Sequence, residues 1–283
     1  MFHQQIAAFD PLAFLEKLDV KTQFPCSSWA ATDRGWRKII AFEPVDSFRL
    51  DPGQDPEELV NFARQHQQCL LFGFLSYDLG YELYQLKGKA APESSLPLIQ
   101  FYAYDQYILS EETQAELYFQ KQDFPARVRA ILAQPSPTRR ASSEYHLQPR
   151  IQRESYNQNF AKIQEYIKAG DIYQINYTHR LEGQTNRDSL ELYHSLLEKN
   201  PVEYAAFIGT PDFEIISLSP ESFIKVKDGK IQTLPIKGTR PRGKTAAEDK
   251  ANQKSLLASE KEQAELFMIV DLLRNDLGKV CRT

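Results

Sequence analysis

The chain has 283 residues, which is enough for one large domain or two ordinary ones. Its 38 acidic and 34 basic residues leave a net charge of -4, and neither sign forms a long block, so we expect no nucleic acid partner. No segment reaches the roughly eighteen apolar residues that a membrane span needs, and the first residues lack a secretory signal pattern. These features predict a cytoplasmic protein without a membrane partner, and the widely spaced Cys26, Cys69 and Cys281 predict free thiols.

The first part of the chain is rich in short apolar and aromatic runs. Residues 69–74 and 100–104 are two of them, and such runs are typical of β-strands. From 134 to 143 the sequence becomes polar and contains prolines, a composition that disfavours helix and buries little surface. We therefore place a linker near 134–150, between one region at 1–140 and a second at 150–283.

A helix is expected at the start of the second region. Tyr156, Phe160, Ile163 and Ile167 follow one another at spacings of three and four, which predicts one buried helical face, and Gly170 is expected to end the helix. Residues 171–178 are β-prone, and one face of that predicted strand is largely polar. Such a face either lines a cavity or meets solvent, and both possibilities stay open.

A hairpin is expected around Asp228-Gly229, the dipeptide that best suits a two-residue type I′ turn. Continuing the register from this turn sets Glu221 opposite Ile236 and brings it close to Lys237. A simple register points the Glu221 and Lys237 side chains to opposite faces, and we predict a bulge near Pro235 that turns them to the same side.

A glutamate beside a lysine has two interpretations. Glu221 and Lys237 form either a salt bridge or a proton-transfer group with its nucleophile, since a lysine amine attacks when its surroundings lower its pKa. Lys237 has apolar neighbours before it, and Gly238 after it permits close backbone approach by a ligand. The sequence pattern alone leaves both interpretations open.

Two more helices are expected, at 188–198 and at 260–275. Ser259 and Glu262 form a capping-box pattern at the start of the second one, which is apolar on nearly every side and is therefore expected to be buried. Glu265 lies on its apolar stripe and needs a partner there. That partner is either a hard cation such as Mg2+ or a basic side chain such as Arg274.

Taken together, four segments in this order resemble the chorismate-utilising enzyme family, and residues 71–80 resemble its N-terminal region. The four segments are residues 169–176, residues 217–221, residues 235–239 with Arg242-Gly243, and residues 268–278. The resemblance implies an α+β fold in which antiparallel sheets pack together with helices outside, and in which the two halves of the sequence interleave.

The residue at position 237 separates members of this family. Anthranilate and isochorismate synthases commonly have a small residue there, whereas the lysine is similar to aminodeoxychorismate synthases. The resemblance then implies that the Lys237 amine attacks C2 of chorismate, that Glu221 moves the proton, and that Gly238 and Thr239 bind substrate. It also implies that Glu265 is a ligand of Mg2+, and that ammonia comes from a separate glutamine amidotransferase subunit.

One departure from the family pattern is expected to matter. The family continues well beyond the segment at 274–278, with a catalytic histidine, a glycine-rich loop, a second metal-binding glutamate and a basic residue for a substrate carboxylate. We therefore expect the isolated 283-residue chain to be a C-terminally truncated fragment without measurable synthase activity.

Two other functions compete with the aminodeoxychorismate synthase assignment. One is anthranilate synthase, against which Lys237 argues. The other is an inactive remnant that only binds the glutaminase subunit, and a truncated interleaved fold is expected to aggregate unless a partner covers its apolar surface. Residues 24–28 lie where related anthranilate synthases bind tryptophan, but an ordinary turn is the preferred interpretation.

Overall fold

The computed structural model describes residues 1–32, 35–86, 96–137 and 146–282. The chain forms two compact units. The first unit combines Met1–Ser136 with Tyr193–Thr283, and the second is Pro137–Leu192. Part of the predicted linker, residues 138–145, lies outside the described residues, so the division at 134–150 stays a prediction.

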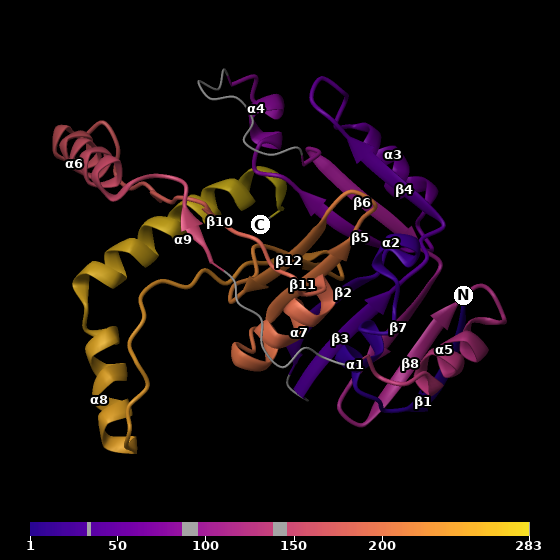
Figure 1. The fold of residues 1–283 in the computed structure, drawn as a ribbon. Helices are drawn as coiled ribbons and strands as arrows, with labels where there is room; N and C mark the ends of the chain where they lie inside the picture. Colours follow the sequence, from indigo (N-terminus) through magenta and orange to yellow (C-terminus); the bar gives the residue numbers. More distant parts are fainter. Residues whose placement is uncertain (33–34, 87–95, 138–145, 283) are drawn as a thin grey trace. The chain divides into compact units, whose positions relative to one another are not determined.

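A seven-stranded antiparallel sheet organises the first unit (Figure 1). Its order is β1-β8-β7-β3-β2-β11-β12. The strands are β1 (Phe2–Ala7), β2 (Cys26–Thr32), β3 (Gly35–Ala41), β7 (Gln106–Ser110), β8 (Gln114–Phe119), β11 (Tyr204–Gly209) and β12 (Glu214–Ser219). Because Ser28 of β2 pairs with Ala206 of β11, both halves of the sequence contribute to one sheet, which confirms the expected α+β fold with antiparallel sheets.

A second, three-stranded sheet in the same unit has the order β4-β6-β5. It consists of β4 (Asp46–Leu50), β5 (Leu70–Leu75) and β6 (Ile99–Tyr104), so the strands predicted at 69–74 and 100–104 are confirmed. Ser47 pairs with Tyr102 and Arg49 with Gln100, and paired residues two positions apart point to the same face. These four side chains therefore share one face of the sheet.

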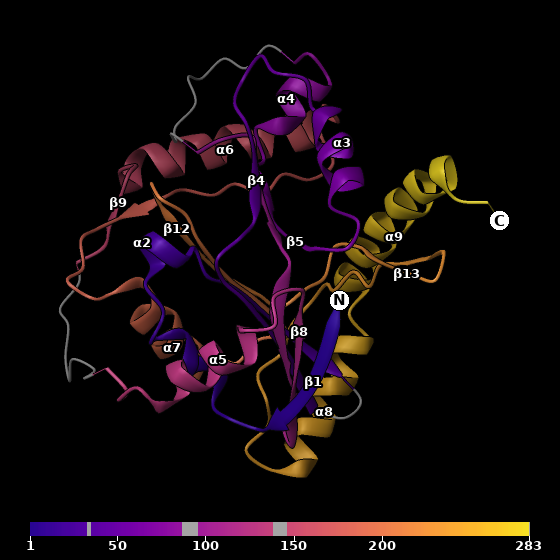
Figure 2. The ribbon, with the colours of Figure 1, turned by 90° about the vertical axis from the view of Figure 1, so that its right-hand side faces the viewer.

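Short helices accompany the sheets of the first unit: α1 (Pro11–Leu15), α2 (Val20–Gln23), α3 (Glu58–Gln65), α4 (Leu79–Leu83) and α5 (Phe124–Ala133). The fully buried Phe42, directly after β3, contacts Phe14 of α1 and Phe124 of α5 at ring-centroid distances of 5.9 and 5.6 Å. Burial of such aromatic rings stabilises the docking of both helices, and Figure 2 shows α5 next to β8.

The second unit contains β9 (Gln148–Pro149), α6 (Arg153–Ala169), β10 (Leu181–Glu182) and the start of α7 (Ser189–Lys199). The predicted helices are confirmed, and Gly170 ends α6 in the left-handed conformation at φ +79°. The expected buried face of α6 is wrong, because no residue of α6 is buried and Phe160 is 48% exposed. The prediction of a strand at 171–178 is wrong. Tyr177 stacks on Tyr156 at 4.8 Å and accepts a hydrogen bond of 2.8 Å from Asn159, so this run contacts α6 through side chains instead of pairing with a strand.

The last part of the chain returns to the first unit with β13 (Lys225–Lys227), β14 (Lys230–Gln232), α8 (Ala246–Leu257) and α9 (Glu260–Val280). The predicted hairpin is confirmed: Asp228 and Gly229 have φ values of +50° and +71°, as a type I′ turn requires. The predicted bulge near Pro235 is wrong, because the ladder already ends at the Lys225–Gln232 pair.

Two predictions about α9 need correction. The helix begins at Glu260 as expected, but Ser259 makes no side-chain capping bond, and the Glu262 carboxylate accepts from Arg240 while the Ser259 N–H donates to the Leu256 carbonyl. The helix is also not buried: Phe267 is 66% and Leu272 57% exposed. An apolar pattern on all sides shows that a helix has surface suited to burial. It does not show that another element of the chain packs on that surface. Figures 1 and 2 show α8 and α9 meeting at a bend.

Candidate active site

Lys237 lies in the extended segment that follows β14. The side chain is half-buried, and among the described residues no hydrogen bond or ion pair involves its amine. A salt bridge with Glu221, one of the two interpretations of the sequence pattern, is therefore absent from the contacts of the described residues. An amine that no carboxylate holds is free to contact a ligand.

The side chain of Glu221 contacts the same segment. Its Oε1 accepts a hydrogen bond of 3.0 Å from the backbone N–H of Ile236, the residue before Lys237. The Ser219 hydroxyl fixes the backbone of Glu221, accepting from its N–H at 3.3 Å and donating to its carbonyl at 2.9 Å. The structure thus brings the Glu221 side chain to Ile236, the residue that the hairpin register set opposite it, although the strand pairing itself ends at Lys225 and Gln232.

Gly238 has a conformational and a steric reason to be glycine. Its φ is +74°, a left-handed conformation that disfavours other residues. A Cβ added there would lie 2.8 Å from both Glu262 Oε2 and Leu256 Cδ1. The close approach expected from a ligand is made here by α8 and α9, so Gly238 lets the lysine-bearing segment lie against these helices.

Asp249 in the first turns of α8 holds the segment beyond Gly238. It accepts two hydrogen bonds of 2.8 Å from the Arg242 guanidinium and one of 2.8 Å from the backbone N–H of Gly243. The Arg242 bond and the Gly243 N–H lower the pKa of Asp249 to about 2, because both favour its charged form. This anchor was not predicted, although Thr245 and Glu248 form a capping-box pattern that marks the start of α8.

Two further contacts attach the same segment to the helices. Arg240 donates to Glu262 Oε1 at 3.3 Å and to the Thr239 carbonyl at 2.7 Å. The Asn252 amide of α8 donates to the Pro241 carbonyl at 3.0 Å. The segment from Lys237 to Gly243 is therefore fixed at several points, while the Thr239 side chain stays exposed.

Glu265 lies on α9, three residues after Glu262 and hence on the same side of the helix. Its partially exposed carboxylate is 4.0 Å from Lys261, whereas Arg274, the basic partner considered from sequence, lies 3.9 Å from Asp271. In the described part of the chain, no group of three or more His, Cys, Asp and Glu side chains is placed to hold a metal. Since Mg2+ takes one or two protein carboxylates and completes its shell with water and substrate oxygens, Glu265 fits as a single ligand.

The chain is similar in sequence to known proteins. The model of a family described as chorismate binding enzyme matches residues 25–283. The chain is 35% identical over 212 residues to aminodeoxychorismate synthase component 1 of Klebsiella aerogenes, covering 74% of this chain and 47% of that protein. It is 42% identical over 132 residues to anthranilate synthase component 1 of Acetivibrio thermocellus, covering 47% of this chain and 27% of that protein.

Solved structures agree on the fold. Anthranilate synthase component I from Streptococcus pneumoniae TIGR4 superimposes with a TM-score of 0.73 at 25% identity, covering 86% of this chain and 61% of that chain. The menaquinone-specific isochorismate synthase MenF from Escherichia coli gives a TM-score of 0.66 at 14% identity over 100% of this chain and 65% of that chain. The chain spans about half the length of the first curated relatives it matches. Among the helices of the described residues, none has the length and apolar character to cross a bilayer.

Proposed function

The chain belongs to the family of chorismate binding enzymes, and from this premise we propose that it aminates chorismate to 4-amino-4-deoxychorismate. The observation that carries the proposal is Lys237, a lysine of the Pro235–Thr239 segment that pairs with no carboxylate among the described residues and follows the residue that Glu221 contacts. Because the matched region is about half of each curated relative, the complete reaction, its substrates and its partner belong to the proposal.

The proposed chemistry is covalent. The Lys237 amine forms a bond to C2 of chorismate as the bond between C4 and its hydroxyl breaks. Ammonia then forms a bond to C4, and the bond between C2 and lysine breaks, which returns the free amine. Each step is easier than a single direct displacement of hydroxide by ammonia.

Proton transfer is the proposed task of Glu221. The departing hydroxyl needs a proton to leave as water, and the attacking amine loses one. The hydrogen bond from Ile236 N–H holds the Glu221 carboxylate at the segment that carries the nucleophile. Gly238 and Thr239 are proposed to contact substrate from the same segment.

Glu265 is proposed as one protein ligand of Mg2+, which, when bound, offsets the negative charge of a substrate carboxylate. Ammonia is proposed to come from a glutamine amidotransferase subunit, since the relative aminodeoxychorismate synthase component 1 is by its name one component of a larger enzyme.

A second candidate function is the synthesis of anthranilate. The 42% identity to an anthranilate synthase component 1 supports it. The two functions differ in the carbon that is aminated and in whether the enzyme supplies a nucleophile, so the product distinguishes them.

The test uses the protein expressed from its natural gene beside the 283-residue chain, each with chorismate, ammonium and Mg2+. Products are separated and identified by mass spectrometry. We expect 4-amino-4-deoxychorismate from the natural gene product, and a loss of at least about a hundredfold in rate for Lys237→Ala, because the nucleophile is removed. Lys230→Ala is the matched control, since Lys230 is an exposed lysine of the hairpin, and it should retain the parent rate.

Two outcomes count against the proposal. Anthranilate as the product would establish the second candidate function. A Lys237→Ala variant as active as its parent would contradict the covalent mechanism.

A further inference from the structure

A hollow of about 470 Å³ opens in the first unit, between the three-stranded sheet and the turn that joins β11 to β12. Its floor is the face that carries Ser47, Arg49, Gln100 and Tyr102. Pro211 and Asp212 of the turn contribute to its wall. The volume lies in the range of small-molecule sites, and none of these residues takes part in the proposed reaction of Lys237.

Two polar side chains on the floor are almost completely buried. Gln100 is 5% and Tyr102 4% exposed, and among the described residues neither the amide nor the hydroxyl has a hydrogen-bond partner. The polar atoms of both side chains are not fully enclosed and meet the solvent of the hollow. Both side chains line the hollow, so a ligand there can satisfy them.

The hydroxyl of Tyr102 lies within electrostatic reach of charged groups that line the hollow. Burial raises the pKa of Tyr102 to about 12, and the charges of Asp212 and Arg49 act on the same group. The hydroxyl therefore stays protonated at neutral pH and both donates and accepts hydrogen bonds. The carbonyl oxygen of the Gln100 amide adds an acceptor beside it.

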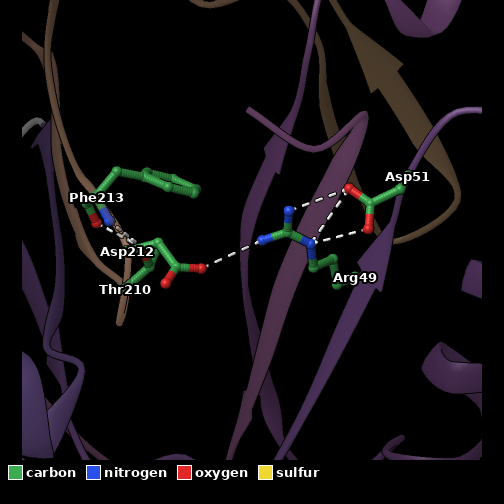
Figure 3. A network of polar contacts seen from close by, with 5 residues as sticks. All are labelled: Arg49, Asp51, Thr210, Asp212 and Phe213. Carbon is green, nitrogen blue, oxygen red and sulfur yellow. Dashed lines mark hydrogen bonds and ion pairs between the residues drawn. The ribbon is translucent and has the colours of Figure 1, made fainter. Parts of the chain in front are cut away.

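The charge of the hollow is negative. Arg49 supplies its positive charge, but Asp51 already accepts from Nε at 3.0 Å and from one terminal nitrogen at 3.1 Å (Figure 3). Asp212 lies 3.5 Å from another nitrogen of Arg49 and is 72% exposed at its side chain. Glu43 and Asp46 also line the hollow and are paired with Arg127 and His66 respectively. Of the three carboxylates that line the hollow, Asp212 therefore has the longest distance to its ion-pair partner.

Hydrogen bonds fix the turn that forms one wall of the hollow. The Thr210 hydroxyl donates to the Phe213 carbonyl at 2.6 Å and accepts from its N–H at 3.0 Å, which holds the turn that carries Asp212 (Figure 3). On the opposite wall, Phe24 has a left-handed φ of +43° and stacks on Tyr102 with centroids 6.2 Å apart. Stacked rings beside a carboxylate attract a cation through their faces.

We propose that this hollow binds a small organic cation, a protonated amine attached to a flat or apolar group. The ammonium group lies against Asp212, which Arg49 holds only at 3.5 Å because Asp51 takes two of the Arg49 hydrogen bonds. The apolar part contacts the rings of Phe24 and Tyr102, and the Tyr102 hydroxyl and Gln100 carbonyl accept the remaining N–H bonds. This site is independent of the proposed amination.

The test compares three probes with one skeleton and different charge: 2-phenylethylamine, 2-phenylethanol and 3-phenylpropionate. Binding to the full chain is measured by titration calorimetry and by ligand-observed NMR, at low and at high salt. We expect the amine to bind at least about tenfold more tightly than the alcohol, with the difference reduced by salt, since an exposed charge pair is screened. The anion should bind most weakly.

Variants locate the site. Asp212→Asn should reduce the affinity of the amine to that of the alcohol, and Tyr102→Phe should weaken both probes without changing their ratio by much. Asp228→Asn, at the tip of the hairpin, is the matched carboxylate control and should bind as the parent does. Circular dichroism confirms that each variant is folded.

Three results would overturn the proposal: no probe binds at millimolar concentration, the anion binds better than the amine, or Asp212→Asn and Asp228→Asn behave alike. Any of these results would show that this hollow does not bind an organic cation through Asp212.

Discussion

Burial decides which thiol of this protein can react. Cys26 is fully buried, and its sulfur lies 2.9 Å from the Tyr104 hydroxyl. Burial raises the pKa of the Cys26 thiol to about 12, because the interior disfavours the thiolate. Burial and the charge of Asp105 raise the pKa of Cys69 as well.

This difference gives a prediction for alkylation of the native protein. Since the thiolate is the nucleophile, the raised pKa leaves Cys26 unreactive near neutral pH, and its burial also keeps the reagent out. Iodoacetamide labelling at pH 8 with peptide mapping should modify the partially exposed Cys281 first and leave Cys26 unmodified until the protein unfolds. Equal labelling rates for Cys26 and Cys281 would contradict the described burial.

At the scale of elements, the segment from Lys237 to Gly243 keeps its position through contacts with α8 and α9. Asp249 makes the largest set of these contacts, through Arg242 and Gly243. Its pKa is depressed from the ordinary 3.8 to about 2, so it is the ionised form that anchors the segment. The contribution is fully present above the ordinary value and is lost as the pH falls through about 2.

Asp249→Asn should therefore loosen the segment. Amide hydrogen exchange at 237–243 is expected to speed up by roughly three- to tenfold at pH 7, because the charge-assisted bonds to Arg242 are replaced by weaker ones. Asp271→Asn on α9 is the control, since Asp271 is exposed and 3.9 Å from its partner. Unchanged exchange in Asp249→Asn would mean that the other contacts suffice.

Local signals could be predicted well from the sequence, and contacts between distant elements could not. Asp228-Gly229 specifies its hairpin by backbone conformation alone, and α6 ends where Gly170 supplies a left-handed residue. The strand predicted at 171–178 failed because β-propensity acts through neighbouring strands, and Tyr177 contacts α6 instead. Asp249 was missed for the same reason, since its function depends on how α8 lies against the segment.

At the scale of the whole molecule, the sheet order brings together strands that the sequence separates. The pairing of β2 with β11 joins Cys26–Ser28 to Ala206–Ile208, and no local pattern predicts it. The steric reason for glycine at position 238 also became apparent only in the structure, where Glu262 and Leu256 lie close to it. The candidate nucleophile could be named from its segment, whereas the absence of an ion pair between Lys237 and Glu221 among the described residues required the structure.

The exposed apolar residues of α9 predict self-association of the 283-residue chain. Phe267 is 66% and Leu272 57% exposed, and large apolar side chains on one element promote aggregation. Replacing both by serine should lower the aggregated fraction several-fold in light scattering and sedimentation at equal concentration. Val60→Ser, at an exposed apolar position of α3, is the control. An equal effect of that change would show that the aggregation does not depend on α9.

The most direct test of the proposed covalent mechanism is the intact mass of the natural gene product incubated with chorismate and Mg2+ in the absence of ammonia. We predict an adduct with the mass of chorismate less one water, mapped by peptide sequencing to Lys237 and released when ammonium is added. We also predict no adduct in Lys237→Ala and an unchanged one in Lys230→Ala. Steady formation of 4-amino-4-deoxychorismate by the Lys237→Ala protein, or an adduct on another residue, would contradict the covalent mechanism.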